Sequence, residues 1–256
     1  MTEKYSTTLK QAIELYNKKK YIEAKLEFLK VAKEESSDFL VTEAILYLGK
    51  IALRGEAELF FDAKNYLDYV IMSGNSRQKE QAYFELANKY RLLENNEESI
   101  NYYQKCLKLF PEDTYCLMNL ASLYLKLGKL NEAEQTYYKL IKASENARVP
   151  SKKVIGINTA YIGLAKINLR KGDIKMFLSF LNKVEIVTEK DAELVDDIQA
   201  DLMFYYEKYP EAIAKYQRSL KSKSFYIREY TKEKVAVLQA LNGNHKESKH
   251  ILERNY

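Results

Sequence analysis

Small side chains recur in pairs along the chain, and the two members of a pair are usually 12 residues apart. The first members of successive pairs are separated by 34 to 44 residues, with large apolar residues at fixed places in between. Two helices can approach closely only where their side chains are small, so each pair predicts one helical hairpin. The pairs are Ala12 and Ala24, Gly49 and Ala63, Ala87 and Ser99, Ala121 and Ala133, Ala165 and Phe177, Ala200 and Ala212, and Ala236 and Ser248.

Large residues and turn residues complete each predicted hairpin. Phe177 stands where a small residue is expected, so we expect local repacking there. A Gly or Asn between the helices is expected to adopt the left-handed conformation that ends a helix. The turns are expected at Lys19-Lys20, Glu94-Asn95-Asn96, Gly128-Lys129, Gly172-Asp173, Lys208-Tyr209-Pro210 and Gly243-Asn244. A large core residue follows the second member of each pair by four positions: Phe28, Leu67, Tyr103, Tyr137, Leu181, Tyr216 and Leu252.

The composition supports an all-α fold. Only 8 Gly and 3 Pro occur among 256 residues, which leaves little material for β-hairpins and favours helices. We predict one domain over residues 1–256 with about seven helix-turn-helix units, near residues 5–38, 42–79, 80–113, 114–147, 158–191, 193–226 and 229–256. About ten extra residues fall around 148–157, with Arg148 to Lys153 as the obvious place for them. They imply a longer loop, lengthened helices, or a bend between units four and five.

The unit at residues 80–113 resembles the tetratricopeptide repeat family. The family's order of large, small and proline positions is met there by Tyr83, Leu86, Ala87, Tyr90, Ser99, Tyr103 and Pro111. Unit two has a longer turn and is similar to the Sel1-like variant. The resemblance implies a right-handed α-solenoid in which the first helices of successive units line a concave groove. That groove usually receives an extended peptide or a helix of a partner protein.

The same resemblance places candidate peptide-binding residues on the concave face. Asn88 and Asn119 match two asparagines of the family, and an amide can pair with a peptide backbone as donor and acceptor. Lys166 and Arg170 lie one helical turn apart and either hold an acidic group or form a solvated pair. The full set of candidate residues is Asn88, Arg91, Asn119, Ser122, Lys166 and Arg170.

Charge and cysteine content narrow the class of protein. The net charge is +5, and residues 215–256 carry 10 Lys or Arg against 4 Glu, or +6. This basic end could bind nucleic acid or an acidic partner, but a solvated helix surface is the preferred interpretation, so nucleic acid is disfavoured.

The two cysteines, Cys106 and Cys116, are expected to be free thiols in a reducing compartment. With no apolar run long enough for a membrane span and no signal-peptide pattern, we expect a soluble cytoplasmic protein.

Motifs for catalysis, cofactors and metals are missing from the sequence. It contains no glycine-rich phosphate loop, no GxSxG, no HExxH and no paired CxxC. His245 and His250 lie about 140° apart on a predicted helix and cannot face one metal ion. The acidic residues Asp196, Asp197 and Asp201 are expected to form a solvated helix face. We therefore expect no enzyme activity, no cofactor and no metal.

Two functional hypotheses follow. The first is a non-catalytic adaptor or scaffold that binds a peptide or helix of a partner protein in the concave groove. The second is a regulatory sensor that binds a signalling peptide and acts on another chain. The partner, the pathway and the oligomeric state are not encoded in any motif that we find.

Overall fold

The computed structural model describes residues 6–54, 60–187, 189–220 and 225–253. Within these ranges the chain forms fourteen α-helices and no β-strand. The first seven helices are α1 Thr7–Asn17, α2 Tyr21–Glu34, α3 Asp38–Ala52, α4 Phe60–Ser73, α5 Ser76–Leu92, α6 Asn96–Leu109 and α7 Thr114–Lys126. The others are α8 Leu130–Glu145, α9 Pro150–Arg170, α10 Ile174–Leu181, α11 Glu189–Tyr205, α12 Tyr209–Leu220, α13 Phe225–Leu241 and α14 His245–Glu253. The predicted all-α solenoid of helical repeats is confirmed.

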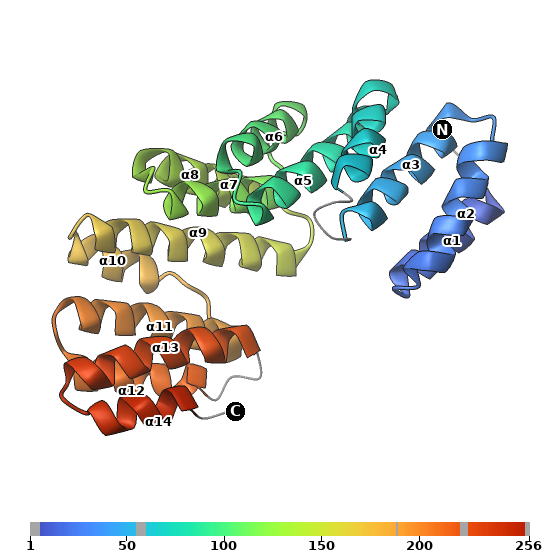
Figure 1. Ribbon diagram of the computed structural model, residues 1–256. Helices are drawn as coiled ribbons and strands as arrows, with labels where there is room; N and C mark the ends of the chain where they lie inside the picture. The colour runs from blue at the N-terminus through green and yellow to red at the C-terminus, as the bar shows by residue number, and fades with distance from the viewer. Residues whose placement is uncertain (1–5, 55–59, 188, 221–224, 254–256) are drawn as a thin grey trace. The chain divides into compact units, whose positions relative to one another are not determined.

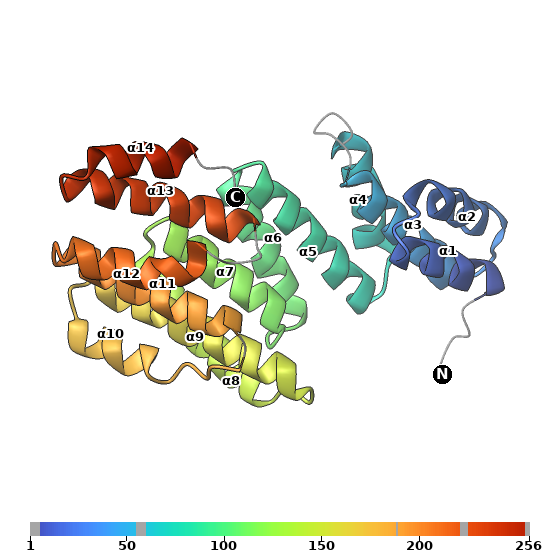
Figure 2. The same cartoon turned by 90° about the horizontal axis from the view of Figure 1, so that it is seen from below.

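The chain divides into two compact units, residues 1–128 and 129–256. In the first unit, the helices α1 to α6 form three successive antiparallel hairpins, followed by α7 (Figure 1). In the second unit, α8 packs against α9, and the hairpins α9–α10, α11–α12 and α13–α14 lie side by side (Figure 2). The first helices of neighbouring hairpins also touch within each unit, as α3 touches α5 and α9 touches α11.

The paired small residues do lie at the centres of the hairpins. Of the fourteen residues in the predicted pairs, all but Ser248 are buried. In the third hairpin, Ser99 Oγ donates a 2.9 Å hydrogen bond to the carbonyl of Ala87, which joins the two members of one pair. Phe177 is fully buried in the slot that usually holds a small residue. The spacing therefore identified the helix contacts.

The predicted large core residues are confirmed in six hairpins and wrong in the seventh. Phe28, Leu67, Tyr103, Tyr137, Leu181 and Tyr216 are buried. Leu252 is 53% exposed, whereas Ile251 is 5% exposed and belongs to a core cluster with Ala236 and Leu238. Adjacent helical residues point about 100° apart, so only one of the two can face α13. The register of the last helix is therefore one residue earlier than expected.

A single left-handed residue lies seven positions after the first small residue in six of the hairpins. Glycine takes this position in three of them: Gly128, Gly172 and Gly243. In the others it is Lys19, Glu94 or Glu207, with φ of 61°, 58° and 57°. The expectation that Gly or Asn would fill the role is wrong at Glu94, where Asn95 follows; the turns at Lys19 and Glu207 contain neither residue. In the third hairpin, Asn95 instead caps α6 by accepting a hydrogen bond from the amide of Glu98 at 3.2 Å.

The extra residues before the fifth hairpin lengthen α9. This helix has 21 residues and begins at Pro150, so the expected loop at residues 148–153 ends at Val149. Proline fits the first turn of a helix because its missing amide hydrogen has no partner there. The long helix packs tightly on α8, where a methyl group at Gly163 would overlap the ring of Tyr137.

The two cysteines form a disulfide rather than the expected free thiols. Cys106 lies near the end of α6 and Cys116 near the start of α7, and both are fully buried. The chain reverses direction after Pro111, and Asp113 caps α7 by accepting a 2.8 Å hydrogen bond from the amide of Cys116. This turn brings the two Cα atoms to 6.9 Å. The expectation of free thiols failed because sequence separation says little about separation across a helix-helix turn.

Candidate peptide-binding surface

The six candidate residues all lie on first helices of hairpins. Asn88 and Arg91 belong to α5, and Asn119 and Ser122 belong to α7, all in the first unit. Lys166 and Arg170 belong to α9 in the second unit. The asparagines are half-buried and the other four are exposed. Each unit thus carries its own part of the predicted surface, and the binding role of these residues stays a prediction.

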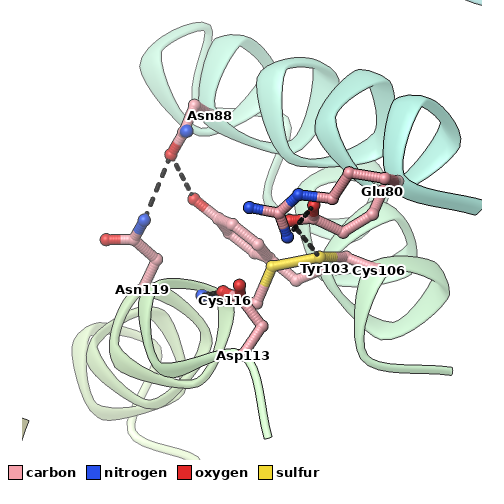
Figure 3. Close-up of a disulfide and its surroundings, with 8 residues drawn as sticks. Glu80, Asn88, Tyr103, Cys106, Asp113, Cys116 and Asn119 are labelled. Carbon is pink, nitrogen blue, oxygen red and sulfur yellow. Dashed lines mark hydrogen bonds and ion pairs between the residues drawn. A yellow bond between two sulfur atoms is a disulfide. The ribbon is translucent and has the colours of Figure 1, made fainter. Parts of the chain in front are cut away.

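The two asparagines hydrogen-bond to each other and to a core tyrosine of the third hairpin. Tyr103 Oη donates to Asn88 Oδ1 at 2.6 Å, and Asn119 Nδ2 donates to the same oxygen at 3.3 Å. Figure 3 shows the Tyr103 hydroxyl and the Asn119 amide nitrogen both directed at the amide oxygen of Asn88. Burial raises the pKa of Tyr103, while Arg91 and Asn119 near its hydroxyl act in the opposite direction. The asparagine carbonyl expected to face a peptide is therefore partly used within the repeat stack.

The second unit repeats this arrangement with charged groups. Tyr216 Oη donates to Asp201 Oδ1 at 2.5 Å, and Lys234 Nζ donates to the same oxygen at 2.7 Å. Asp201 follows Ala200 as Asn88 follows Ala87, and Lys234 precedes Ala236 by two positions as Asn119 precedes Ala121. Asn119 and Lys234, each two positions before a small residue, therefore contact the preceding hairpin. Asn119 was predicted to face the groove, and its contact with Asn88 was not predicted.

Lys166 has an acidic neighbour, Asp201, on the next hairpin. Desolvation lowers the pKa of Lys166, and the charge of Asp201 on α11 acts in the opposite direction. Lys166 is nevertheless exposed at the surface, so we expect solvent to keep this lowering small. For Lys166, the acidic group that it was predicted to hold is thus partly supplied by the protein itself. An acidic partner would compete with α11 for Lys166.

A mostly apolar cavity that the sequence did not suggest lies beside the Tyr216–Asp201 contact. Its volume is about 350 Å³. Phe204, Val237 and Leu238 provide apolar walls, and Phe204 and Val237 are 44% and 55% exposed. Such a cavity can accept one apolar side chain of a bound segment.

The basic C-terminal stretch, residues 215–256, lies partly outside the described residues. In its described part, Lys215 pairs with Asp196 at 3.4 Å, and Lys234 pairs with Asp201. These two lysines are used in internal contacts, and the solvated helix surface predicted for this stretch stays a prediction. His245 and His250 are both exposed. Among the described helices, none is both long enough and apolar enough to cross a membrane.

Comparison with known proteins agrees with the repeat pattern. A tetratricopeptide repeat family profile matches residues 91–149. The solved structure of a tetratricopeptide repeat protein from Parabacteroides merdae superposes with a TM-score of 0.67 at 19% identity and covers 96% of both chains. Residues 91–149 therefore match the tetratricopeptide repeat family, and the chain has the fold of a tetratricopeptide repeat solenoid. The Sel1-like character of its second unit stays a prediction.

Two further likenesses show the range of proteins with these repeats. The structure of NprR in complex with its cognate peptide NprX superposes with a TM-score of 0.66 at 16% identity, covering 96% of this chain and 75% of that one. A Drosophila melanogaster homolog of the BBSome complex member BBS4 is 26% identical over 159 residues, which is 62% of this chain. The match spans only 30% of that relative's length. The likeness to the two solved structures, at 19% and 16% identity, shows the fold alone.

Proposed function

We propose that this protein is a non-catalytic adaptor whose first helices bind an extended segment or helix of a partner protein. The tetratricopeptide fold supports a protein-interaction scaffold. The observation that carries the proposal is the amide pair Asn88 and Asn119 on successive first helices. Their mutual contacts use Asn88 Oδ1 and Asn119 Nδ2. The other two amide atoms, Asn88 Nδ2 and Asn119 Oδ1, provide one donor and one acceptor for a peptide backbone.

Around this pair, Arg91 and Ser122 would contact the same segment in the first unit. Lys166 and Arg170 would contact an acidic group in the second unit. The cavity beside Tyr216 would accept an apolar side chain. The first unit would thus bind the backbone of a partner segment. The second unit would by itself bind a segment with at least one acidic residue and one large apolar residue.

Asn88→Asp separates binding from folding. An aspartate keeps the acceptor for Tyr103, as Asp201 does for Tyr216, but removes the amide donor offered to a peptide. With a photo-cross-linking residue at Leu92, which is exposed on α5 next to Arg91, the otherwise wild-type protein is expected to capture a discrete set of partners from its own cells. Asn88→Asp is expected to lose that set without a change in thermal stability.

Two controls accompany this experiment. A cross-linker at Lys105, exposed on the second helix α6, should capture none of these partners. Asn101→Ala, on the same helix, should leave capture unchanged. Identical capture by the wild type and Asn88→Asp would exclude the amide pair as the binding site.

A second candidate function is a regulatory sensor that binds a signalling peptide and acts on another chain. The likeness to NprR, solved with its cognate peptide, supports it at the level of fold. A sensor is expected to change its solution X-ray scattering when a peptide binds. Unchanged scattering in the presence of a peptide that demonstrably binds would favour the adaptor.

A further inference from the structure

Three side chains from three different helices converge at the disulfide of the first unit. Glu80 comes from α5, Cys106 from α6 and Cys116 from α7. One carboxylate oxygen and the two sulfur atoms all lie within 4.8 Å of one another. Glu80 is 4% exposed, and the cysteines are fully buried. Figure 3 shows the carboxylate facing the sulfur atoms.

The carboxylate of Glu80 is poorly satisfied in the disulfide form. Its Oε1 lies 3.8 Å from Cys106 Sγ, but a disulfide sulfur carries no hydrogen to donate. Its Oε2 forms a 2.8 Å ion pair with Arg77 Nη1, yet that contact lacks hydrogen-bond geometry, and Oε2 has no hydrogen-bond partner among the described residues. Arg77 is itself 63% exposed, so solvent screens its charge. Burying a carboxylate with such weak partners costs folding free energy unless another group compensates its negative charge.

Charge and geometry indicate that a divalent cation would compensate the buried carboxylate of Glu80. After reduction, two thiolates and one carboxylate carry a charge of about −3, which a divalent cation and Arg77 would neutralise. Thiolate and carboxylate ligands together suit Zn²⁺, which binds sulfur at about 2.3 Å and oxygen at about 2.0 to 2.2 Å. The Cα atoms of the cysteines are 6.9 Å apart, just beyond the usual range for disulfides. This separation leaves room for two distinct sulfur atoms on one ion.

We propose that Glu80, Cys106 and Cys116 form a zinc site when the disulfide is reduced. A dithiol reductant gives two electrons and two protons to the disulfide and is itself oxidised to a disulfide. The two resulting thiols then release their protons to solvent as their sulfurs bind the ion. Water completes the coordination. The disulfide joins α6 and α7 only, whereas the ion also joins α5, so the redox state decides whether two or three helices are linked.

The test uses the full chain, reduced and kept free of oxygen, with Co²⁺ as a spectroscopic probe for zinc. The wild type is expected to bind one equivalent and to show thiolate-to-cobalt charge-transfer bands with tetrahedral visible bands, which one equivalent of Zn²⁺ abolishes. The oxidised protein is expected to show neither. Cys106→Ser and Cys116→Ser are each expected to lose the charge-transfer signal of the two-thiolate site.

Glu80→Gln distinguishes this site from a bare pair of thiols. It keeps the size and position of the side chain, and we expect its affinity for Zn²⁺ to fall by roughly tenfold or more. The control Glu97→Gln, at an exposed position on α6, should bind like the wild type. Circular dichroism confirms that each variant is folded. Absence of the charge-transfer bands in the reduced wild type, or wild-type affinity in folded Glu80→Gln, would overturn the proposal.

Discussion

Tyr103 and Asn88 are joined by a 2.6 Å hydrogen bond from the tyrosine hydroxyl to the amide oxygen. Tyr216 and Asp201, at the same repeat positions in the other unit, are joined in the same way at 2.5 Å. Each tyrosine fills the core with its ring and orients a residue of the first helix with its hydroxyl. In each unit, one tyrosine thus links the packing of the core to the orientation of a polar residue on the first helix.

Tyr103→Phe is expected to destabilise the protein by about 1 kcal/mol, because it removes one hydrogen bond while keeping the buried ring. Urea unfolding followed by circular dichroism measures the change. Tyr138→Phe is the matched control, since Tyr138 is 49% exposed, and it should have no measurable effect. Equal effects of the two changes would show that the hydroxyl of Tyr103 contributes nothing.

Gly163→Ala is expected to destabilise the second unit by about 1 to 3 kcal/mol, because the added methyl group overlaps the Tyr137 ring. Thermal unfolding measures the loss. Adding Tyr137→Leu should make the combined effect smaller than the sum of the single effects, since the shorter side chain makes room for the methyl group. Additive effects would place the overlap elsewhere.

Lys19→Gly is expected to stabilise the protein by about 0.5 to 1 kcal/mol. Lys19 has a φ of 61°, which is unfavourable for a residue with a Cβ atom and costs glycine little. Lys18→Gly is the control, because its φ of −77° suits any residue and the change should not stabilise.

The converse substitution tests the same idea in another hairpin. Gly172 has a φ of 75°, and a methyl group there would meet no atom within 4 Å. Gly172→Ala is therefore expected to cost about 1 kcal/mol through backbone strain alone. A neutral result in chemical denaturation would show that the turn relaxes.

Glu85→Gln is expected to change the pH dependence of stability. Desolvation raises the pKa of Glu85 in the folded protein, against the opposing charges of Lys50 and Arg54. Between the unfolded and folded pKa values, the folded protein binds more protons, so stability falls as pH rises through this window. Glu85→Gln lacks this loss of stability. Its free energy of unfolding relative to that of the wild type should therefore increase from about pH 4 toward neutrality.

Unfolding midpoints across this pH range, measured on the oxidised protein, test the effect of Glu85. Glu97→Gln, which removes an exposed carboxylate, is the control and should give a difference from wild type that does not vary with pH. A flat difference for Glu85→Gln as well would show that Glu85 titrates alike in the folded and unfolded chains.

Much of the repeat fold could be predicted because its pattern is local. The small residues at Ala87 and Ser99 mark a contact between two helices joined by a short turn, so spacing alone identifies it. The register of the last helix was harder, because Ile251 and Leu252 are both apolar and only the packing against α13 distinguishes them. The turn at Lys19-Lys20 was predicted, but the left-handed conformation of Lys19 was not, because lysine fits this conformation poorly and the rest of the hairpin imposes it.

For the candidate binding surface, the sequence could predict which helix carries each residue but not which side chains it contacts. The sequence places Asn88 and Asn119 on the correct helices, but it cannot show that both bond to each other and that Asn88 also bonds to Tyr103. The same holds for Lys166, whose acidic neighbour Asp201 is 35 residues away in the chain. Such contacts depend on how one hairpin stacks on the next.

By itself, the sequence determined the helical hairpins, their order and the small residues at their contacts, because these follow from periodicity within about 40 residues. Only the tertiary structure decided which polar groups meet between hairpins: Cys106 with Cys116, Glu80 with their sulfur atoms, and Tyr103 with Asn88. The physical reason is that helical periodicity fixes which face of a helix is buried. The distance between particular atoms on facing helices depends on the rotation and close packing of each helix pair.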